Sequence, residues 1–161
     1  MFNDAIPRFG PNAIPYPRPT DVSRLFPDPN KSLDVLLVME NAHLVPEDRT
    51  WSLVWRVQND SPEYRLIQVV KEGFYGHESS WMKWGARTTA YHSRVQGAVT
   101  VAVGKYSLEQ RQKWENLANG ITVRDDCNAS LLFVKDILDA AVGAGLLTHN
   151  SATSLVNKLG A

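Results

Sequence analysis

Short apolar runs separated by turn-forming residues predict strands in the first half of this chain. Leu33–Met39 is aliphatic with two β-branched positions, and Trp51–Val57 and Tyr64–Val70 follow it. Runs of this length that are rich in β-branched and aromatic residues are typical of strands. The turn residues 59–62 (Asn-Asp-Ser-Pro) separate the last two runs, so we expect these two strands to pair as a hairpin.

Further along, the pattern predicts a fourth strand and a capped helix. Val95–Val103 alternates with small residues and is expected to end at Gly104. Ser107, followed three residues later by Gln110, has the spacing of a capping box, which marks a helix start. The apolar positions of that helix continue to Gly120, and glycine commonly ends a helix.

Two more helices are predicted in the C-terminal part. A long one is expected from a cap at Asp125 or Asp126 to about Leu147, because its apolar residues recur at helical spacing. A short one is expected after a cap at Ser151. This order of elements indicates the α+β class: a mainly antiparallel sheet of about four to five strands packed against two or three helices.

Residues 71–94 match neither a strand nor a helix period and are rich in aromatic residues. We interpret them as a long loop or irregular strands around the rim of a pocket for a small-molecule or peptide ligand. The candidate walls of that pocket are Phe74, Tyr75, Trp81, Trp84 and Tyr91. Trp51 is a further candidate contact, although it shares strand parity with Leu53 and Trp55, which is typical of core side chains. Interleaved basic residues make an anionic or aromatic ligand compatible with this region.

Residues 1–31 differ in composition from the rest, since they hold seven of the nine prolines. Proline lacks the N–H donor and biases the preceding residue to extended geometry, so neither a helix nor an inner strand is expected here. Two alternatives stay open: a flexible, polyproline-like arm, or an arm that lies on the domain or on a neighbouring subunit. Its many apolar residues favour the second. We therefore divide the chain into an arm (1–31) and a single α+β domain (32–161), and a homo-oligomer formed through the arm is one alternative.

Composition narrows the class of protein. Seventeen basic and seventeen acidic residues balance, and no run of Lys and Arg stands out, so we expect no nucleic-acid partner. The single cysteine excludes an internal disulfide and fits a reducing compartment. We find no secretory signal core and no membrane span, and expect a cytoplasmic protein. The four histidines give no metal-ligand spacing and no phosphate-binding loop is present, so no cofactor is expected.

The order of motifs over residues 51–147 resembles small fungal proteins related to the lecithin:retinol acyltransferase-like branch of permuted papain-like thiol proteins. In that pattern a strand with a His-Trp-Ala-Leu-type segment comes first, and an Asn-Cys-Gln-x-Trp-type segment begins the thiol helix. The counterparts here are residues 50–53 (Thr-Trp-Ser-Leu), 65–68 (Arg-Leu-Ile-Gln), 101–104 (Val-Ala-Val-Gly), 126–128 (Asp-Cys-Asn) and 144–147 (Ala-Gly-Leu-Leu). The resemblance excludes the proline-rich arm, and it implies a permuted papain-like fold with Cys127 as the thiol.

The chain departs from that pattern at two positions. Thr50 stands where the family has its histidine, and the small pair Ala129-Ser130 replaces the aromatic residue after the cysteine. Threonine cannot accept a thiol proton near neutral pH, and general-base help contributes about 10²–10⁴-fold to such reactions. The resemblance therefore implies the frame of a thiol enzyme more firmly than its activity.

Cys127 and three histidines are the candidate catalytic residues. A helix N-terminus favours a thiolate, whereas the two acidic residues before Cys127 disfavour it, so the sequence leaves its reactivity open. His43, His77 or His92 would be the relocated base, and the alternative for each is a surface or loop residue. The alternative for Cys127 is a small buried apolar group.

Two functions of different class remain. In the first, the chain is a non-catalytic or weakly catalytic binding or interaction module on a degenerate permuted papain-like fold, with an aromatic-lined pocket. In the second, it is a cysteine-dependent enzyme for acyl transfer or for amide or thioester hydrolysis, with Cys127 as nucleophile and helix amides stabilising the oxyanion. The missing histidine favours the first.

Overall fold

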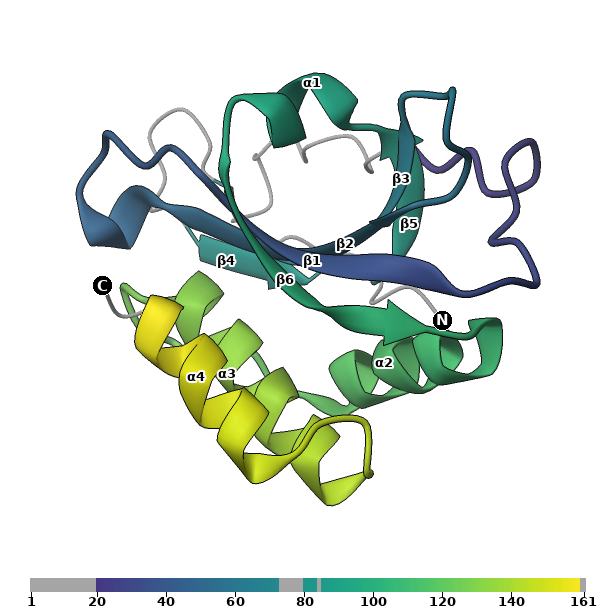
Figure 1. Cartoon of the computed structure of the whole chain (residues 1–161). Coiled ribbons are helices and arrows are strands. Elements are labelled where there is room, and N and C mark those ends of the chain that lie inside the picture. The colour runs from purple at the N-terminus through teal and green to yellow at the C-terminus, as the bar shows by residue number, and fades with distance from the viewer. Residues whose placement is uncertain (1–19, 73–79, 84, 160–161) are drawn as a thin grey trace, which may run out of the picture.

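The computed structural model describes residues 20–72, 80–83 and 85–159, and an antiparallel sheet forms its centre. The described strands are β1 (Leu33–Glu40), β2 (Thr50–Arg56), β3 (Glu63–Glu72), β4 (Ser80–Lys83), β5 (Arg87–Ala90) and β6 (Val99–Tyr106). Their order is β4-β3-β2-β1-β6, and β5 shares the outer side of β3 with β4 (Figure 1). Every pairing is antiparallel, so the predicted α+β class is confirmed. The permuted papain-like arrangement stays a prediction.

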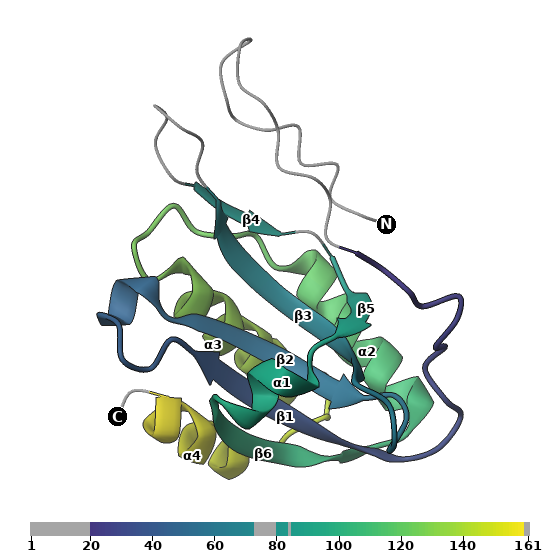
Figure 2. The ribbon, with the colours of Figure 1, turned by 90° about the horizontal axis from the view of Figure 1, so that it is seen from above.

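Three helices cover one face of the sheet and a short helix lies on the other (Figure 1). The layer of three consists of α2 (Leu108–Gly120), α3 (Ala129–Gly143) and α4 (His149–Leu159), with α3 in the middle (Figure 2). We call this side of the sheet the helix face. The other side carries α1 (His92–Gln96), and we call it the α1 face. A 3₁₀ turn, η1 (Pro46–Asp48), connects β1 to β2, and none of the described helices is long and apolar enough to cross a membrane.

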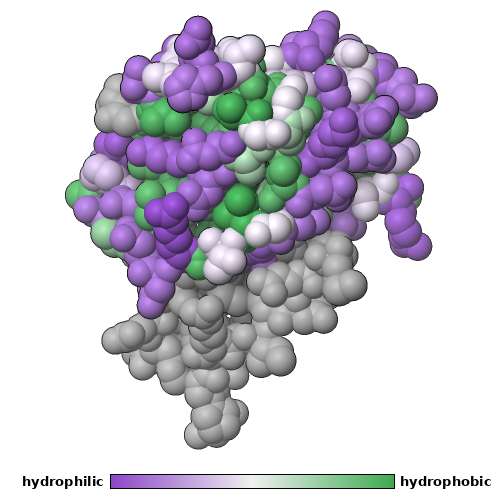
Figure 3. All heavy atoms as spheres, turned by 90° about the horizontal axis from the view of Figure 1, so that it is seen from below, coloured by the Kyte–Doolittle hydropathy of each residue, from purple (hydrophilic) through white to green (hydrophobic). Residues whose placement is uncertain are grey.

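The main core lies on the helix face. Alternation along β2 sends Trp51, Leu53 and Trp55 to that side, where all three are buried, so the core role that their parity predicted is confirmed. They belong to one cluster with five of the buried residues of α3, namely Phe133, Val134, Ile137, Leu138 and Ala141. Burial of a large apolar side chain of this kind contributes about 1.5–3 kcal/mol. From the helix side, apolar residues form a band between hydrophilic ones (Figure 3).

The predicted hairpin and the predicted first helix are both confirmed. β2 and β3 pair in register from Ser52 opposite Gln68 to Arg56 opposite Tyr64. At the start of α2, the Ser107 hydroxyl accepts the N–H of residue 110 at 3.2 Å, and the residue 110 side chain accepts the Ser107 N–H at 2.9 Å. This reciprocal capping box satisfies two donors that a helix start leaves open.

The bounds predicted for the long C-terminal helix are wrong at both ends. Its N-cap is Asn128, because the Asp126 carboxylate accepts the Asn128 N–H at 2.8 Å and forms a turn ahead of the helix. The helix ends at residue 143 because Gly145 has φ 78°, and the Leu146 N–H then bonds the Ala141 carbonyl at 2.9 Å. A left-handed glycine just beyond a helix closes it in this way.

The last helix also begins earlier than predicted. The Ser151 N–H donates to the hydroxyl of Thr148 at 3.1 Å, so Thr148 acts as the cap and Ser151 lies inside the first turn of α4. Threonine and serine are both accepted at caps, and only the tertiary position of the chain decides between them.

The structure of residues 85–106 refines one prediction and corrects another. The region predicted as a long loop or irregular strands contains the short strand β5 and also α1, which was not predicted, and Val95 lies in α1 rather than in a strand. Elements of four or five residues are too short to show a hydrophobic period. β6 continues past Gly104, because a register shift with β1 accommodates the glycine inside the strand. A Cβ at Gly104 would lie 3.2 Å from the Tyr106 ring, so the close approach of that ring requires glycine.

Residues 20–31 lie on the domain, as the docked alternative for the arm requires. The Val22 N–H donates to the Thr88 carbonyl of β5 at 2.8 Å, and the Asp21 carboxylate accepts the Thr88 N–H at 3.1 Å. Phe26 packs against the main core. Residues 1–19 lie outside the described residues, and a homo-oligomer formed through the arm stays a prediction.

Arg111 of α2 holds residues 28–31 in place through hydrogen bonds from the helix side of the sheet. Its side chain is fully buried, and all three of its nitrogens donate hydrogen bonds. Asp28 accepts at 2.8 Å, Pro29 O at 2.7 Å, Lys31 O at 2.6 Å and Tyr106 O at 2.7 Å. A buried guanidinium is tolerated when a carboxylate neutralises it and its N–H groups are satisfied. Arg111 therefore fixes the path of the chain into β1.

Candidate functional site

A row of polar side chains crosses the α1 face. By strand alternation Glu40, Ser52 and Gln68 point to this side, and the pairing of Leu66 with Arg87 puts Arg87 there as well. Arg87 Nη2 donates to Gln68 Oε1, and Gln68 Nε2 donates to Ser52 Oγ at 2.7 Å. Each donor orients the next side chain, so the row is a connected network.

Tyr91 joins this row to Glu40. Its hydroxyl donates to Glu40 Oε2 at 2.6 Å and lies 3.5 Å from Ser52 Oγ. Burial and the hydrogen bond to Glu40 raise the pKa of Tyr91 well above its ordinary value, so the phenol stays neutral. Tyr91 is 2% exposed and packs with Tyr64 and Leu66 in a small second cluster. Its side chain is buried, and the ligand contact predicted for Tyr91 stays a prediction.

Arg87 ends the row with unmet hydrogen-bonding capacity. The residue is 8% exposed, and its Nε and Nη1 atoms are buried without a hydrogen-bond partner among the described residues. Burial lowers the pKa of Arg87, and its described hydrogen bond goes to an uncharged amide. Arg87 is therefore a buried cation that the described residues compensate incompletely.

The other end of the α1 face forms an open groove of about 410 Å³. It lies where β1 and β2 meet β3 and β6, and the described residues that line it are Lys31, Ser32, Leu33, Asp34, Leu36, Arg56, Asn59, Tyr64 and Lys105. Leu36 and Tyr64 supply apolar surface, and the rest is mainly polar. We call it the basic groove, because it has three cationic side chains and one carboxylate. Its volume falls within the range of small-molecule sites, about 300–1,000 Å³.

Arg56 is the cation of the basic groove whose side chain makes a hydrogen bond and a ring contact within the described part of the chain. Its Nε donates to the Ser61 carbonyl at 2.8 Å, and its guanidinium lies 5.8 Å from the centre of the Tyr64 ring. The Tyr64 hydroxyl hydrogen-bonds His92 Nδ1 at 3.0 Å, and the two rings stack at 5.9 Å. Burial raises the pKa of Tyr64 above its ordinary value. A turn carbonyl, an aromatic ring and a helix residue thus hold this end of the groove in place.

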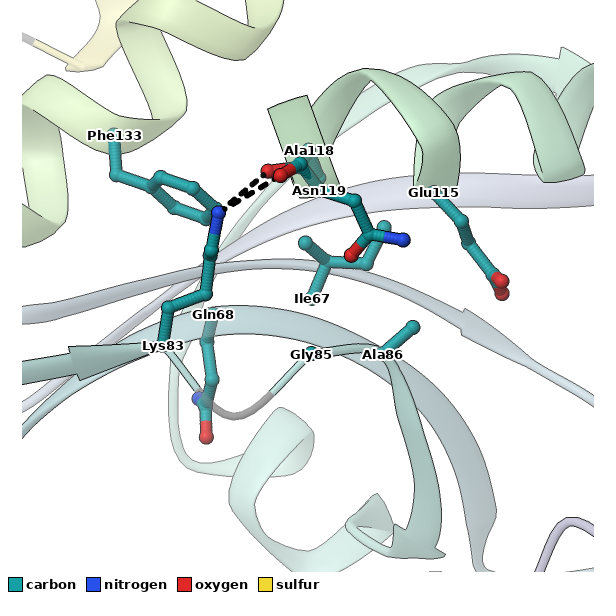
Figure 4. Close-up of a pocket in the computed structure, with 9 residues that line it drawn as sticks. All are labelled: Ile67, Gln68, Lys83, Gly85, Ala86, Glu115, Ala118, Asn119 and Phe133. Atoms are coloured by element: carbon teal, nitrogen blue, oxygen red, sulfur yellow. Dashed lines mark hydrogen bonds between the residues drawn. The ribbon is translucent and has the colours of Figure 1, made fainter. Parts of the chain in front are cut away.

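A second hollow lies between the sheet and the end of α2 (Figure 4). Lys83 of β4 reaches across it, and its ammonium donates to the carbonyls of Asn119 at 3.1 Å and Ile121 at 2.6 Å. A cation at the last carbonyls of a helix stabilises that end. Burial lowers the pKa of Lys83. The hollow has no room for a water molecule, so it is a packing gap rather than a ligand site.

Cys127 is exposed and lies two residues before α3. The Asn128 amide donates to its sulfur at 3.6 Å. The starts of α3 and β2 are adjacent, since the Trp51 N–H donates to the Ser130 hydroxyl at 2.8 Å. By strand alternation, however, Thr50 points to the α1 face, away from Trp51 and the helix layer.

Neither of the two described candidate bases, His43 and His92, has a hydrogen bond to the thiol. His92 bonds Tyr64 on the α1 face, and His43 is exposed in the connection between β1 and β2. No described histidine hydrogen-bonds Cys127. His77 lies outside the described residues, so a base role for it stays a prediction.

Most of the predicted aromatic pocket also lies outside the described residues. Phe74, Tyr75 and Trp84 are not described, and Trp81 is placed in β4 without a description of its side chain. Trp51 is 4% exposed and belongs to the main core.

Sequence reasoning missed the basic groove, because only tertiary structure brings Lys31, Arg56 and Lys105 together: sheet pairing for Arg56 and Lys105, and the hydrogen bonds of Arg111 for Lys31. The available signal was the hairpin, whose register places Arg56 opposite Tyr64.

Comparisons with protein-family models, with curated proteins and with solved structures found no match to this chain. Within the described residues no group of three or more histidine, cysteine, aspartate or glutamate side chains is arranged to hold a metal ion. The geometry of the basic groove and of Cys127 is therefore the basis for a functional proposal.

Proposed function

We propose that this domain is a binding module whose small-molecule ligand occupies the basic groove. The observation that carries the proposal is the open cavity of about 410 Å³, whose walls include an ordered arginine over an aromatic ring. A concave site with a few convergent polar groups beside apolar surface is the usual form of a ligand site. The groove is built by strand ends and by a segment that Arg111 fastens, so it is largely formed before a ligand arrives.

A cysteine-dependent enzyme is the second candidate, because Cys127 is exposed close to the start of α3. An exposed thiol near helix amides is accessible to an acyl or thioester substrate. General-base help contributes about 10²–10⁴-fold, and no described histidine contacts the sulfur. The groove therefore supports binding better than the thiol supports turnover.

The two candidates separate in one pair of measurements on the full chain and on Cys127→Ala. Fragment screening by ¹H–¹⁵N NMR is expected to move the backbone signals of Leu36, Asn59 and Tyr64 equally in both proteins. Hydrolysis of p-nitrophenyl acetate or of a short thioester is expected to be no faster with the full chain than with Cys127→Ala. Cysteine-dependent turnover, or fragments that move only signals around residues 126–130, would contradict the binding proposal.

A further inference from the structure

We infer that the ligand of the basic groove is an anion, a carboxylate or phosphate attached to a small apolar or aromatic body. This inference rests on the proposed function, since it names the chemistry of the ligand for the same groove. It depends on three observations: the charges around the groove, the free donors of Arg56, and the fixed position of the segment that carries Lys31.

The charges of the groove are unbalanced, although the chain as a whole carries no net charge. Lys31 precedes β1, Arg56 ends β2 and Lys105 lies near the end of β6, so three separate segments of the chain each bring a basic residue to one cavity. Asp34 is the only acidic residue among the described lining residues, and it lies opposite Lys105 in the β1–β6 register. No ion pair in the described part of the chain joins Lys31 or Lys105 to a carboxylate. A concave surface with uncompensated charge concentrates ligands of the opposite sign.

Arg56 presents donors that its own fold leaves unused. Its Nε is occupied by the Ser61 carbonyl, which fixes the plane of the guanidinium above Tyr64. The two terminal nitrogens have no hydrogen-bond partner among the described residues. A planar pair of N–H groups fits the two oxygens of a carboxylate or phosphate, and such charge-assisted bonds are about twice as strong as neutral ones. The half-buried side chain of Leu36, together with the 5% of Tyr64 that is exposed, would then contact the apolar body of the ligand.

Lys31 reaches the groove because the opposite side of the molecule holds its backbone. The Lys31 carbonyl accepts from Arg111 Nη1 at 2.6 Å, and Asp28 and Pro29 accept from the same guanidinium. The segment before β1 therefore does not have to be ordered when a ligand binds, which removes part of the entropic penalty of binding.

The test is isothermal titration calorimetry of the full chain with phenyl phosphate, and with phenol as the neutral probe of the same ring. Phenyl phosphate is expected to bind more tightly than phenol by tenfold or more, and its affinity is expected to fall as salt is raised. Arg56→Gln is expected to weaken phenyl phosphate about tenfold or more, and Lys105→Gln by up to about fivefold. Asp34→Asn is expected to strengthen it, because it removes the one opposing charge. The matched control is Lys113→Gln, an exposed change on α2 that removes the same charge without affecting the groove.

Equal binding of phenol and phenyl phosphate in the groove, followed by the NMR signals of Leu36 and Tyr64, would overturn the anion inference and leave the binding module intact. Failure of both probes and of the fragment screen to move those signals would overturn the proposed function itself. Equal weakening by Arg56→Gln and Lys113→Gln would also overturn the inference, since it would assign the effect to overall charge.

Discussion

Arg111 and Arg87 are both buried, yet they lie on opposite faces of the sheet and have opposite surroundings. Arg111 pairs with Asp28 and donates to three backbone carbonyls besides. Arg87 donates to the side chain of Gln68, and two of its nitrogens have no partner among the described residues. The same residue type is thus fully satisfied in one region and incompletely satisfied in the other.

The difference between the two arginines shows which buried cation stabilises the fold. A buried cation stabilises a fold only when a counter-ion and hydrogen bonds offset its loss of hydration. The helix face also buries two indole N–H groups without partners, Trp55 and Trp114, but these are neutral and the loss is smaller. A carboxylate oxygen of Glu63 in β3 is also buried without a partner among the described residues, so Arg87 is the buried cation with unmet donors but not the only charged group with an unmet atom. Proteins commonly retain such local conflicts at the surfaces that they use.

Among these predictions, Arg111→Ala is expected to change the free energy of unfolding most. This change leaves Asp28 and three carbonyls without their donor and frees the segment that enters β1, so we expect a loss of about 3–5 kcal/mol in the free energy of unfolding. Guanidinium denaturation followed by tryptophan fluorescence measures it. Lys113→Ala, two residues further along α2 and exposed, is the control and is expected to change the same quantity by at most about 0.5 kcal/mol. A loss of less than about 1 kcal/mol in the free energy of unfolding for Arg111→Ala would mean that the hydrogen bonds of Arg111 do not stabilise the fold.

Tyr91→Phe tests the polar row of the α1 face, with an expected loss of stability smaller than that for Arg111→Ala. It removes a hydrogen bond to a carboxylate, so we expect a loss of about 1.5–3 kcal/mol at neutral pH. The raised pKa of Tyr91 means that the folded state favours the neutral phenol. Its contribution is therefore complete below the ordinary tyrosine pKa of about 10 and is lost as the pH rises above it. The gap in unfolding free energy between wild type and Tyr91→Phe should narrow above pH 10.

Tyr106→Phe is the control for that pH dependence, because the Tyr106 hydroxyl donates to the backbone carbonyl of Leu146 rather than to an acid. Burial also raises the pKa of Tyr106, so a smaller narrowing is expected there. A constant gap for Tyr91→Phe up to the pH of alkaline unfolding would show that Tyr91 ionises as freely in the folded as in the unfolded chain.

The long elements of this fold could be predicted from the sequence, because their signals are local. The capping box at Ser107 predicted the start of α2, and the parity of Trp51 and Trp55 predicted the main core. The start of α3 could not be predicted, since Asp126 uses its carboxylate in a turn while Asn128 occupies the N-cap position without a side-chain hydrogen bond to the helix. Both residue types suit either role, and tertiary packing decides between them.

The candidate site was much harder to predict than the fold. The sequence emphasised Cys127 and scattered histidines, whereas the groove depends on Lys31, Arg56 and Lys105, which are far apart in the chain. Isolated basic residues on a neutral chain carry no signal, because nothing local shows which of them converge. The registers of β1 with β2 and β6 bring Arg56 and Lys105 to one cavity, and the hydrogen bonds of Arg111 bring Lys31 there.

Arg87→Met is expected to change the free energy of unfolding least, and it tests directly whether Arg87 differs from Arg111. The change keeps most of the volume of the side chain, removes a buried charge that is incompletely compensated, and leaves Gln68 Oε1 without a donor. The gain and the loss are of similar size, so we expect the free energy of unfolding to change by no more than about 1 kcal/mol in either direction. The same denaturation experiment measures it beside Arg111→Met, which should lose most of what Arg111→Ala loses. A loss of 3 kcal/mol or more for Arg87→Met would mean that Arg87 is as well compensated as Arg111, and the contrast between the two faces would no longer hold.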